Sequence, residues 1–145
     1  MSYTYKYPRP AVTTDAVVFL ENDNGFEILL IQRKNEPFQG MWALPGGFVD
    51  MDETLEEGVV RELEEETGLK GIKLQQLHTF STVDRDPRGR TIGTAYWGFT
   101  TKENSEVKGG DDANEAKWFP INKLPKLAFD HQEIVEMALL EIKQS

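Results

Sequence analysis

Three glutamates of one short segment, Glu62, Glu65 and Glu66, have a spacing that places them on one face of a helix. Side chains three and four residues apart are neighbours on a helix, because each residue advances the turn by about 100°. Carboxylates this close repel one another unless a cation lies between them, and sulfur-free oxygen ligands suit hard ions such as Mg²⁺ or Mn²⁺. The alternative is a solvated acidic face opposite a core stripe. We expect the three glutamates to bind a divalent cation.

The surrounding segment is strongly acidic and contains one base. Nine of the 25 acidic residues lie between Asp50 and Glu66, where Arg61 is the only basic residue. Arg61 precedes Glu65 by four residues, so it can pair with that carboxylate and orient it. Glu53 can accept a hydrogen bond from the same guanidinium. The alternatives are an ordinary surface ion pair for Arg61 and an acid favoured by the helix dipole for Glu53.

A helix between Thr54 and Gly68 must carry these carboxylates. Thr54 and Glu57 have the spacing of a capping box, and Gly68 suits a left-handed C-terminal cap. Val59 and Leu63 lie on the flank next to the glutamates, which indicates a helix that packs one side against a core.

The segment before this helix predicts a strand that ends in a bare turn. Gln39–Phe48 is apolar but is broken by Pro45, Gly46 and Gly47. Glycine has no Cβ, so another group can approach its backbone closely. We expect this turn to offer backbone groups to whatever the glutamates bind.

The rest of the chain predicts strands and one closing helix. The first two strands flank the turn-like Glu21–Gly25 and should pair as a hairpin. Apolar residues at helical spacing predict the last helix over Asp130–Lys143. The fold class is therefore α/β (α+β), with a mixed sheet packed between helices. Besides the segment Gln39–Phe48, the predicted strands are, in order, Ala11–Leu20, Phe26–Lys34, Ile72–Val83, Thr91–Thr101 and Glu115–Ile121.

Length and composition exclude several classes of protein. A chain of 145 residues without a linker or repeat predicts a single domain over residues 1–145. The net charge of −9 argues against general nucleic-acid binding, and the absence of cysteine excludes disulfides and thiolate zinc sites. The sequence has neither the pattern of a signal peptide nor a run of about 20 apolar residues. We expect no membrane partner and a cytoplasmic location.

From Gly47 the chain reads GFVDMDETLEEGVVRELEEETGL, which resembles the Nudix hydrolase signature at every defined position. Other segments resemble the branch that includes ADP-ribose pyrophosphatases, namely RPAVTTDAVV, LLIQRKNEPFQGMWALPGGFVD, DRDPRGRT, GDDANEAKWF and LAFDH. The residues that match the signature are Gly47, Glu53, Arg61, Glu62, Leu63, Glu65, Glu66, Gly68 and Leu69.

This resemblance implies an alpha/beta/alpha sandwich and an enzyme that hydrolyses a nucleoside diphosphate linked to another group, with ADP-ribose cleaved to AMP and ribose 5-phosphate as the leading case. It implies that Glu62, Glu65 and Glu66 bind Mg²⁺ or Mn²⁺, with the backbone carbonyl of Gly46 as a fourth contributor. Arg61 and Glu53 would organise these ligands. The partner is then a small-molecule nucleotide, and a homodimer is expected because members of this branch often dimerise.

The resemblance leaves the general base undetermined. Glu65 is one candidate, and Asp111, Asp112 and Glu115 of the late loop are the others. We prefer Glu115 within the loop, where the Gly109–Gly110 pair would allow closure over an attacking water. An exposed acid at the end of a polar loop is the alternative for Glu115.

Substrate phosphates require cations that the glutamates cannot supply. The loop DRDPRGR offers Arg85, Arg88 and Arg90, whose guanidinium forks match phosphate geometry, and Arg33 ends an apolar strand nearby. The alternative is a loop whose arginines only aid solubility. Phe48 could present an aromatic face to a base, although aromatics near strands more often belong to the core.

One departure keeps the substrate open. Members that hydrolyse ADP-ribose commonly carry a proline some 15 or 16 residues after the signature, and this chain has Val83 and Asp84 in that interval. Another nucleoside diphosphate sugar, an oxidised nucleoside triphosphate, or a nucleotide-binding module without turnover therefore remain alternatives. An acidic metal-binding or interaction domain is a further one. A DNA-binding regulator is disfavoured by the acidity.

Overall fold

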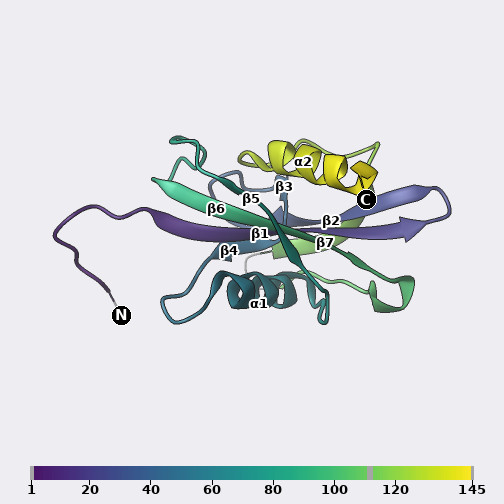
Figure 1. Ribbon diagram of the computed structural model, residues 1–145, viewed down its shortest axis with the longest axis horizontal. Coiled ribbons are helices and arrows are strands. Elements are labelled where there is room, and N and C mark those ends of the chain that lie inside the picture. The colour runs from purple at the N-terminus through teal and green to yellow at the C-terminus, as the bar shows by residue number, and fades with distance from the viewer. Residues whose placement is uncertain (1, 111–112, 145) are drawn as a thin grey trace.

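The computed structural model describes residues 2–110 and 113–144. Within them, a seven-stranded mixed sheet lies between helix α1 (Leu55–Thr67) on one face and helix α2 (His131–Gln144) on the other (Figure 1). The predicted alpha/beta/alpha sandwich is confirmed. The other elements are β1 (Ala11–Asn22), β2 (Gly25–Arg33), β3 (Trp42–Ala43), β4 (Gly46–Phe48), β5 (Gln75–Phe80), β6 (Thr91–Thr100), the 3-10 helix η1 (Lys102–Asn104) and β7 (Ala113–Pro120).

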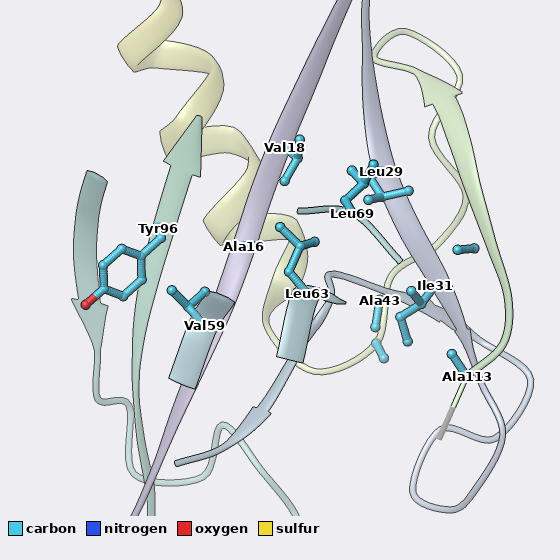
Figure 2. Close-up of a cluster of buried hydrophobic side chains, with 12 residues drawn as sticks. Ala16, Val18, Leu29, Ile31, Ala43, Val59, Leu63, Leu69, Tyr96 and Ala113 are labelled. Atoms are coloured by element: carbon cyan, nitrogen blue, oxygen red, sulfur yellow. The ribbon is translucent and has the colours of Figure 1, made fainter. Parts of the chain in front are cut away.

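Strand β1 is buried on both faces of the sheet. Ala16 and Val18 pack on the α1 side in the cluster drawn in Figure 2, whereas Val17 and Phe19 pack with Ile134 on the α2 side. Successive side chains of a strand point to opposite faces, so a continuous apolar run is what a strand covered on both sides requires. The two helices are thereby held on opposite faces of one strand.

The strands follow the order β3-β2-β1-β6-β5, with β4 on β1 and β7 on β2. The predicted hairpin is present, since Phe19 pairs with Ile28 and Asn22 with Gly25. Strand β6 runs parallel to β1 over almost its whole length, and this pairing makes the sheet mixed. No helix in the part of the chain that the structure describes is long and apolar enough to cross a membrane.

The strand predicted within Gln39–Phe48 is present only as β3, and the turn predicted at Gly46 and Gly47 is wrong because these residues form β4. Strand β3 pairs with β2 through Ile31 and Ala43, while β4 pairs with β1 through Thr14 and Gly47. Between β3 and β4, proline at position 45 has no N–H for a ladder hydrogen bond, so the segment leaves one strand and joins the other. Beyond their hairpin, β1 and β2 are therefore separated by this short segment. Side chains from both faces of the sheet can approach the same space here.

Two other predicted elements have different bounds from those expected. The strand predicted over Ile72–Val83 is regular only at Gln75–Phe80, and the last strand begins at Ala113 rather than Glu115. Residues 81–90 form the loop that leads into β6. This loop carries the arginines that the sequence assigned to substrate.

Candidate active site

Helix α1 has the caps that its sequence predicts. The Thr54 hydroxyl accepts from the backbone N–H of Glu57 at 3.1 Å, and the Glu57 carboxylate accepts from the N–H of Thr54 at 2.9 Å. At the other end Gly68 has φ of 83°, and its N–H donates to the carbonyl of Glu64. Val59 and Leu63 are buried against the sheet, and this packing sets the rotation of the helix. The capping and packing together determine where the glutamates lie.

Arg61 holds three of the predicted site glutamates. Its Nε donates to Glu53 Oε1 at 2.8 Å, and its Nη1 lies 2.9 Å from Glu65 Oε1 and 3.1 Å from Glu62 Oε1. The hydrogen bonds with Glu53 are the main cause of a raised pKa of Arg61. Nη2 also donates to the backbone oxygen of Phe48 at 3.3 Å, which joins the helix to β4.

The two glycines of β4 lie close to helix α1. The N–H of Gly46 donates to Oε1 of Glu66 at 2.7 Å, and Glu66 is only 6% exposed. A Cβ at Gly47 would lie 2.8 Å from Glu62 Oε1, so only glycine leaves room for that carboxylate. Burial raises the pKa of Glu62, and the charge of Arg61 acts against this increase.

Within the described residues, no group of three or more His, Cys, Asp and Glu side chains has a geometry that could hold a metal ion. The reason is visible in the Arg61 contacts, since its guanidinium lies between Glu62 and Glu65. The donor set nevertheless suits a hard divalent cation, because Glu62 and Glu66 offer carboxylate oxygens beside a bare glycine backbone. Glu62 and Glu65 each direct one carboxylate oxygen, Oε1, at Arg61.

A cavity of about 470 Å³ opens where β1 and β2 separate. This volume lies in the usual range of ligand pockets, about 300–1,000 Å³. Glu62 and Glu66 contribute to one wall, and arginines and aspartates from the α2 side contribute to the opposite wall. The lining residues are Thr13, Asp15, Ile31, Arg33, Asn35, Glu36, Ala43, Leu44, Gly46, Gly47, Phe48, Asp50, Glu62, Glu66, Arg85, Asp86, Arg88, Phe129 and His131.

Arg85 lines the cavity, but its guanidinium is engaged by an acid. Its Nε and Nη2 donate to the two carboxylate oxygens of Asp130, each at 2.8 Å, and the Arg85 side chain is 4% exposed. Burial acts to lower the pKa of Arg85. The hydrogen bonds that Arg85 donates to Asp130, together with the negative charge of Asp130, outweigh burial and raise this pKa overall. The structure therefore gives Arg85 a buried partner that the sequence did not predict.

Arg88 and Arg33 lie over aromatic rings at the cavity. The Arg88 guanidinium is 4.7 Å from the ring of Phe48 and 5.4 Å from that of Phe129, and it is hydrogen-bonded to Asp86. Arg33 lies 5.0 Å from the Phe129 ring. Cation–π contacts at these distances orient a guanidinium without neutralising it. Phe48 is thus at the cavity, as predicted, with an arginine over its ring.

Five predicted site residues that the structure describes do not line the cavity, namely Glu53, Arg61 and Glu65 on the α1 side and, elsewhere, Arg90 and Glu115. Arg90 is exposed, and its Nη1 donates to the backbone oxygen of Ser81 at 2.7 Å. Glu115 is exposed on β7, paired with Gln32, while its neighbour Ala116 packs in the cluster on the α1 side. Successive strand residues face opposite sides of a sheet, so Glu115 points away from the α1 face. The other loop candidates, Asp111 and Asp112, lie outside the described residues.

Asp15 and Phe129 line the cavity, and the sequence analysis did not name them as site residues. Asp15 is buried in β1, and a single aspartate inside an apolar strand was the available signal. His131, at the start of α2, accepts from the backbone N–H of Leu44 through Nδ1 at 3.0 Å, and its Nε2 lies 3.5 Å from Asp15 Oδ1. Burial lowers the pKa of His131, opposed by Asp15. Phe129, two residues before His131 in the chain, has φ of 53°.

Comparison with known protein families identifies this arrangement. A model of the NUDIX domain matches residues 11–138. The chain belongs to the Nudix family. Its Nudix relatives include the ADP-ribose pyrophosphatase of Methanocaldococcus jannaschii, 51% identical over 130 residues, which are 90% of this chain and 73% of that protein. A second relative is the ADPR responsive transcriptional repressor NtrR of Acinetobacter baylyi, 33% identical over 94% of this chain and 56% of the repressor.

Solved Nudix structures have the same fold. The NUDIX domain of Shewanella oneidensis NrtR, solved in complex with ADP ribose, superposes with a TM-score of 0.86 and 35% identity over 97% of this chain and 94% of that one. A MutT/nudix family protein from Enterococcus faecalis gives a TM-score of 0.88 and 35% identity over 99% of this chain and 66% of that one. These likenesses cover almost the whole chain.

Proposed function

We propose that this Nudix protein hydrolyses ADP-ribose to AMP and ribose 5-phosphate with Mg²⁺ or Mn²⁺. The observation that carries the proposal is the cavity, in which the glutamates Glu62 and Glu66 face the Arg88 guanidinium across a space of ligand size. A relative named ADP-ribose pyrophosphatase and a neighbour solved with ADP ribose support this choice of substrate.

Nudix hydrolases generally need a divalent cation, and the ligands proposed here are Glu62, Glu65, Glu66 and the Gly46 carbonyl. A bound cation would reduce the repulsion between these glutamates and a diphosphate and lower the pKa of an attacking water. Arg61 and Glu53 position the carboxylates, because the guanidinium hydrogen-bonds both Glu53 and Glu65. Gly46 fixes Glu66 through its N–H.

The opposite wall binds the substrate in this proposal. Arg88 faces the phosphates, with its guanidinium oriented by Asp86 and by the ring of Phe48. Arg33 adds a second cation at the cavity. Water then adds to one phosphorus, the bond between that phosphorus and the bridging oxygen breaks, and both products leave with a terminal phosphate.

Glu65 is the general base that we favour. Its Oε1 accepts from Arg61, and its side chain is 42% exposed, so the carboxylate can reach a water. Glu115 would have to approach from the other side of β7. In kinetics of Glu65→Gln and Glu115→Gln, we expect a large loss of turnover in the first variant and near wild-type turnover in the second. The reverse result would make Glu115 the base.

The likeness to NtrR favours a second candidate, an ADP-ribose-binding Nudix module without turnover. The retained glutamates favour the enzyme, because a binder gains nothing from acids that repel a diphosphate. The test is release of AMP from ADP-ribose, with ADP-glucose and 8-oxo-dGTP as competing substrates and EDTA as the metal-free control. Binding without AMP release would favour the module, and activity confined to 8-oxo-dGTP would overturn the substrate.

The proposed metal site has a test that does not depend on turnover. A cation that binds only the native state stabilises it in proportion to the logarithm of its concentration over its Kd. We expect millimolar Mg²⁺ to raise the melting temperature relative to EDTA at matched ionic strength. Light scattering of the same samples tests the expected homodimer.

A further inference from the structure

Asp15 is a buried acid that the proposed chemistry does not use. It lies in β1 opposite Gly46 of β4, it is 6% exposed, and it lines the cavity. The odd-numbered residues Val17 and Phe19 of the same strand pack on the α2 side, so Asp15 faces the wall opposite the site glutamates.

The carboxylate of Asp15 has few donors for its four lone-pair positions. Nε2 of His131 is a donor 3.5 Å from Oδ1, and the charge of Arg85 also acts on the carboxylate. Nδ1 of His131 accepts from the N–H of Leu44, so the proton of the neutral ring lies on Nε2 and faces Asp15. A contact of 3.5 Å is at the long limit of a hydrogen bond. Buried polar groups are normally satisfied, so this carboxylate has capacity for a ligand donor.

The position of Asp15 restricts which part of a ligand it can contact. A Cβ at Gly46 would lie 2.5 Å from Asp15 Oδ1, so the carboxylate fills the space beside the glycine that holds Glu66. The donor must therefore belong to a group next to the diphosphate. A carboxylate repels phosphate oxygens but accepts readily from a hydroxyl. Each ribose that flanks the diphosphate of ADP-ribose carries such hydroxyls on its ring carbons.

We infer that Asp15 accepts a hydrogen bond from a ribose hydroxyl next to the diphosphate of ADP-ribose and makes the cavity selective for ribosylated diphosphates. The inference rests on the proposed function, since it takes ADP-ribose as the ligand. A site that hydrogen-bonds a substrate hydroxyl strongly rejects an analogue that lacks it, because the buried group is then unpaired. Deoxynucleoside triphosphates, which offer fewer hydroxyls at this place, are therefore poor ligands.

The test is equilibrium binding by calorimetry in EDTA, with ADP-ribose, ADP and 2′,3′-dideoxy-ADP as ligands. The proteins are the wild type, Asp15→Asn, and Asp23→Asn as a matched control at an exposed turn. Asp15→Asn should lose about 10- to 100-fold in affinity for ADP-ribose, as expected for a hydrogen bond to a charged group. Asp23→Asn should bind all three ligands like the wild type.

The three ligands distinguish the two riboses. A loss of affinity confined to ADP-ribose assigns the contact to the terminal ribose. A loss shared with ADP but not with 2′,3′-dideoxy-ADP, which has no ribose hydroxyl, assigns it to the adenosine ribose. Either pattern supports the inference. Equal losses for all three ligands would overturn it, as would wild-type binding by Asp15→Asn or a shift only in the Mg²⁺ requirement for turnover.

Two further measurements keep the test decisive if the Asp15→Asn variant does not fold. The melting temperature of Asp15→Asn is recorded first, and Asp15→Ser replaces it if the amide variant does not fold. The wild type alone must also bind ADP-ribose more tightly than ADP, or ADP more tightly than 2′,3′-dideoxy-ADP. Equal affinity for all three ligands would overturn the inference. Because EDTA prevents turnover, these results are separate from the AMP-release assay, on which the proposed function depends.

Discussion

The two walls of the cavity are built in different ways. The carboxylate wall comes from helix α1 and strand β4 just before it, and its groups are joined through Arg61. The opposite wall combines β1, the loop before β6 and the start of α2, which are far apart in the chain. The carboxylate wall is therefore specified by spacing within one helix, whereas the opposite wall depends on strand register and on how the loops pack.

The walls also differ in how their charges are compensated. On the α1 side, one arginine faces several carboxylates, so negative charge remains for a cation. On the α2 side, each loop arginine at the cavity has its own acid, with Arg85 on Asp130 and Arg88 on Asp86. Paired arginines are held in one orientation and are less available as free cations. The first wall thus suits metal binding, and the second suits oriented contacts with a substrate.

The largest expected effect is on the carboxylate wall. Glu66→Gln keeps the shape of the side chain but removes a charge from the proposed metal ligands, so turnover of ADP-ribose should fall at least about 100-fold. The control is Glu64→Gln on the same helix, whose side chain is 48% exposed. Steady-state kinetics with varied Mg²⁺ measure both. Equal activity of the two variants would contradict a specific role for the buried glutamate.

The next effect separates a structural arginine from a substrate contact. Arg85→Ala removes one partner of a buried ion pair and leaves the charge of Asp130 without compensation. The removal of one such partner lowers the free energy of unfolding by about 3–5 kcal/mol. The double variant Arg85→Ala/Asp130→Ala should be destabilised by less than the sum of the single variants. Urea unfolding of the four proteins measures this. Additive losses, or a stable Arg85→Ala that only raises KM, would restore the substrate role that the sequence suggested.

A smaller effect is expected at the exposed end of the same wall. Arg88→Ala should raise the KM for ADP-ribose about 10-fold and leave kcat almost unchanged, if the guanidinium binds substrate and transition state equally. Arg90→Ala removes the same charge from the same loop but outside the cavity lining, so its KM should stay near the wild-type value. A matching rise in both variants would indicate a general effect of loop charge.

The smallest effect concerns the support beneath the carboxylate wall. The Tyr96 hydroxyl donates to Glu56 of α1 at 2.6 Å, and burial together with this bond raises the pKa of Tyr96 to about 12. The folded state therefore holds the phenol proton more tightly than the unfolded state, where the pKa is 10.0. The stabilisation is complete below pH 10 and is lost as the pH rises toward 12.

Tyr96→Phe removes this titration. Its deficit in unfolding free energy relative to the wild type should be constant between pH 7 and 9 and should shrink above about pH 10. Urea unfolding across this range measures the difference between the two proteins. A deficit that stayed constant up to pH 12 would show that the hydrogen bond to Glu56 does not titrate with Tyr96.

The sequence by itself determined the carboxylate wall. The spacing of Glu62, Glu65 and Glu66 and the cap at Thr54 are local features, and both are present in the structure. The two glycines are also next to the helix, but they lie in strand β4 and not in a turn. Helix geometry relates residues a few positions apart without reference to the rest of the chain. The apolar run Ala11–Leu20 likewise predicted a strand, which is present as β1.

Only the tertiary structure decided the opposite wall. The separation of β1 and β2 depends on where β3 and β4 pair, and the sequence pattern predicted a turn in place of β4. Arg85 meets Asp130 across 45 residues of chain, and Asp15 meets His131 across an even longer separation. Such contacts follow from strand register and from how α2 packs on the sheet, and no local spacing encodes either one.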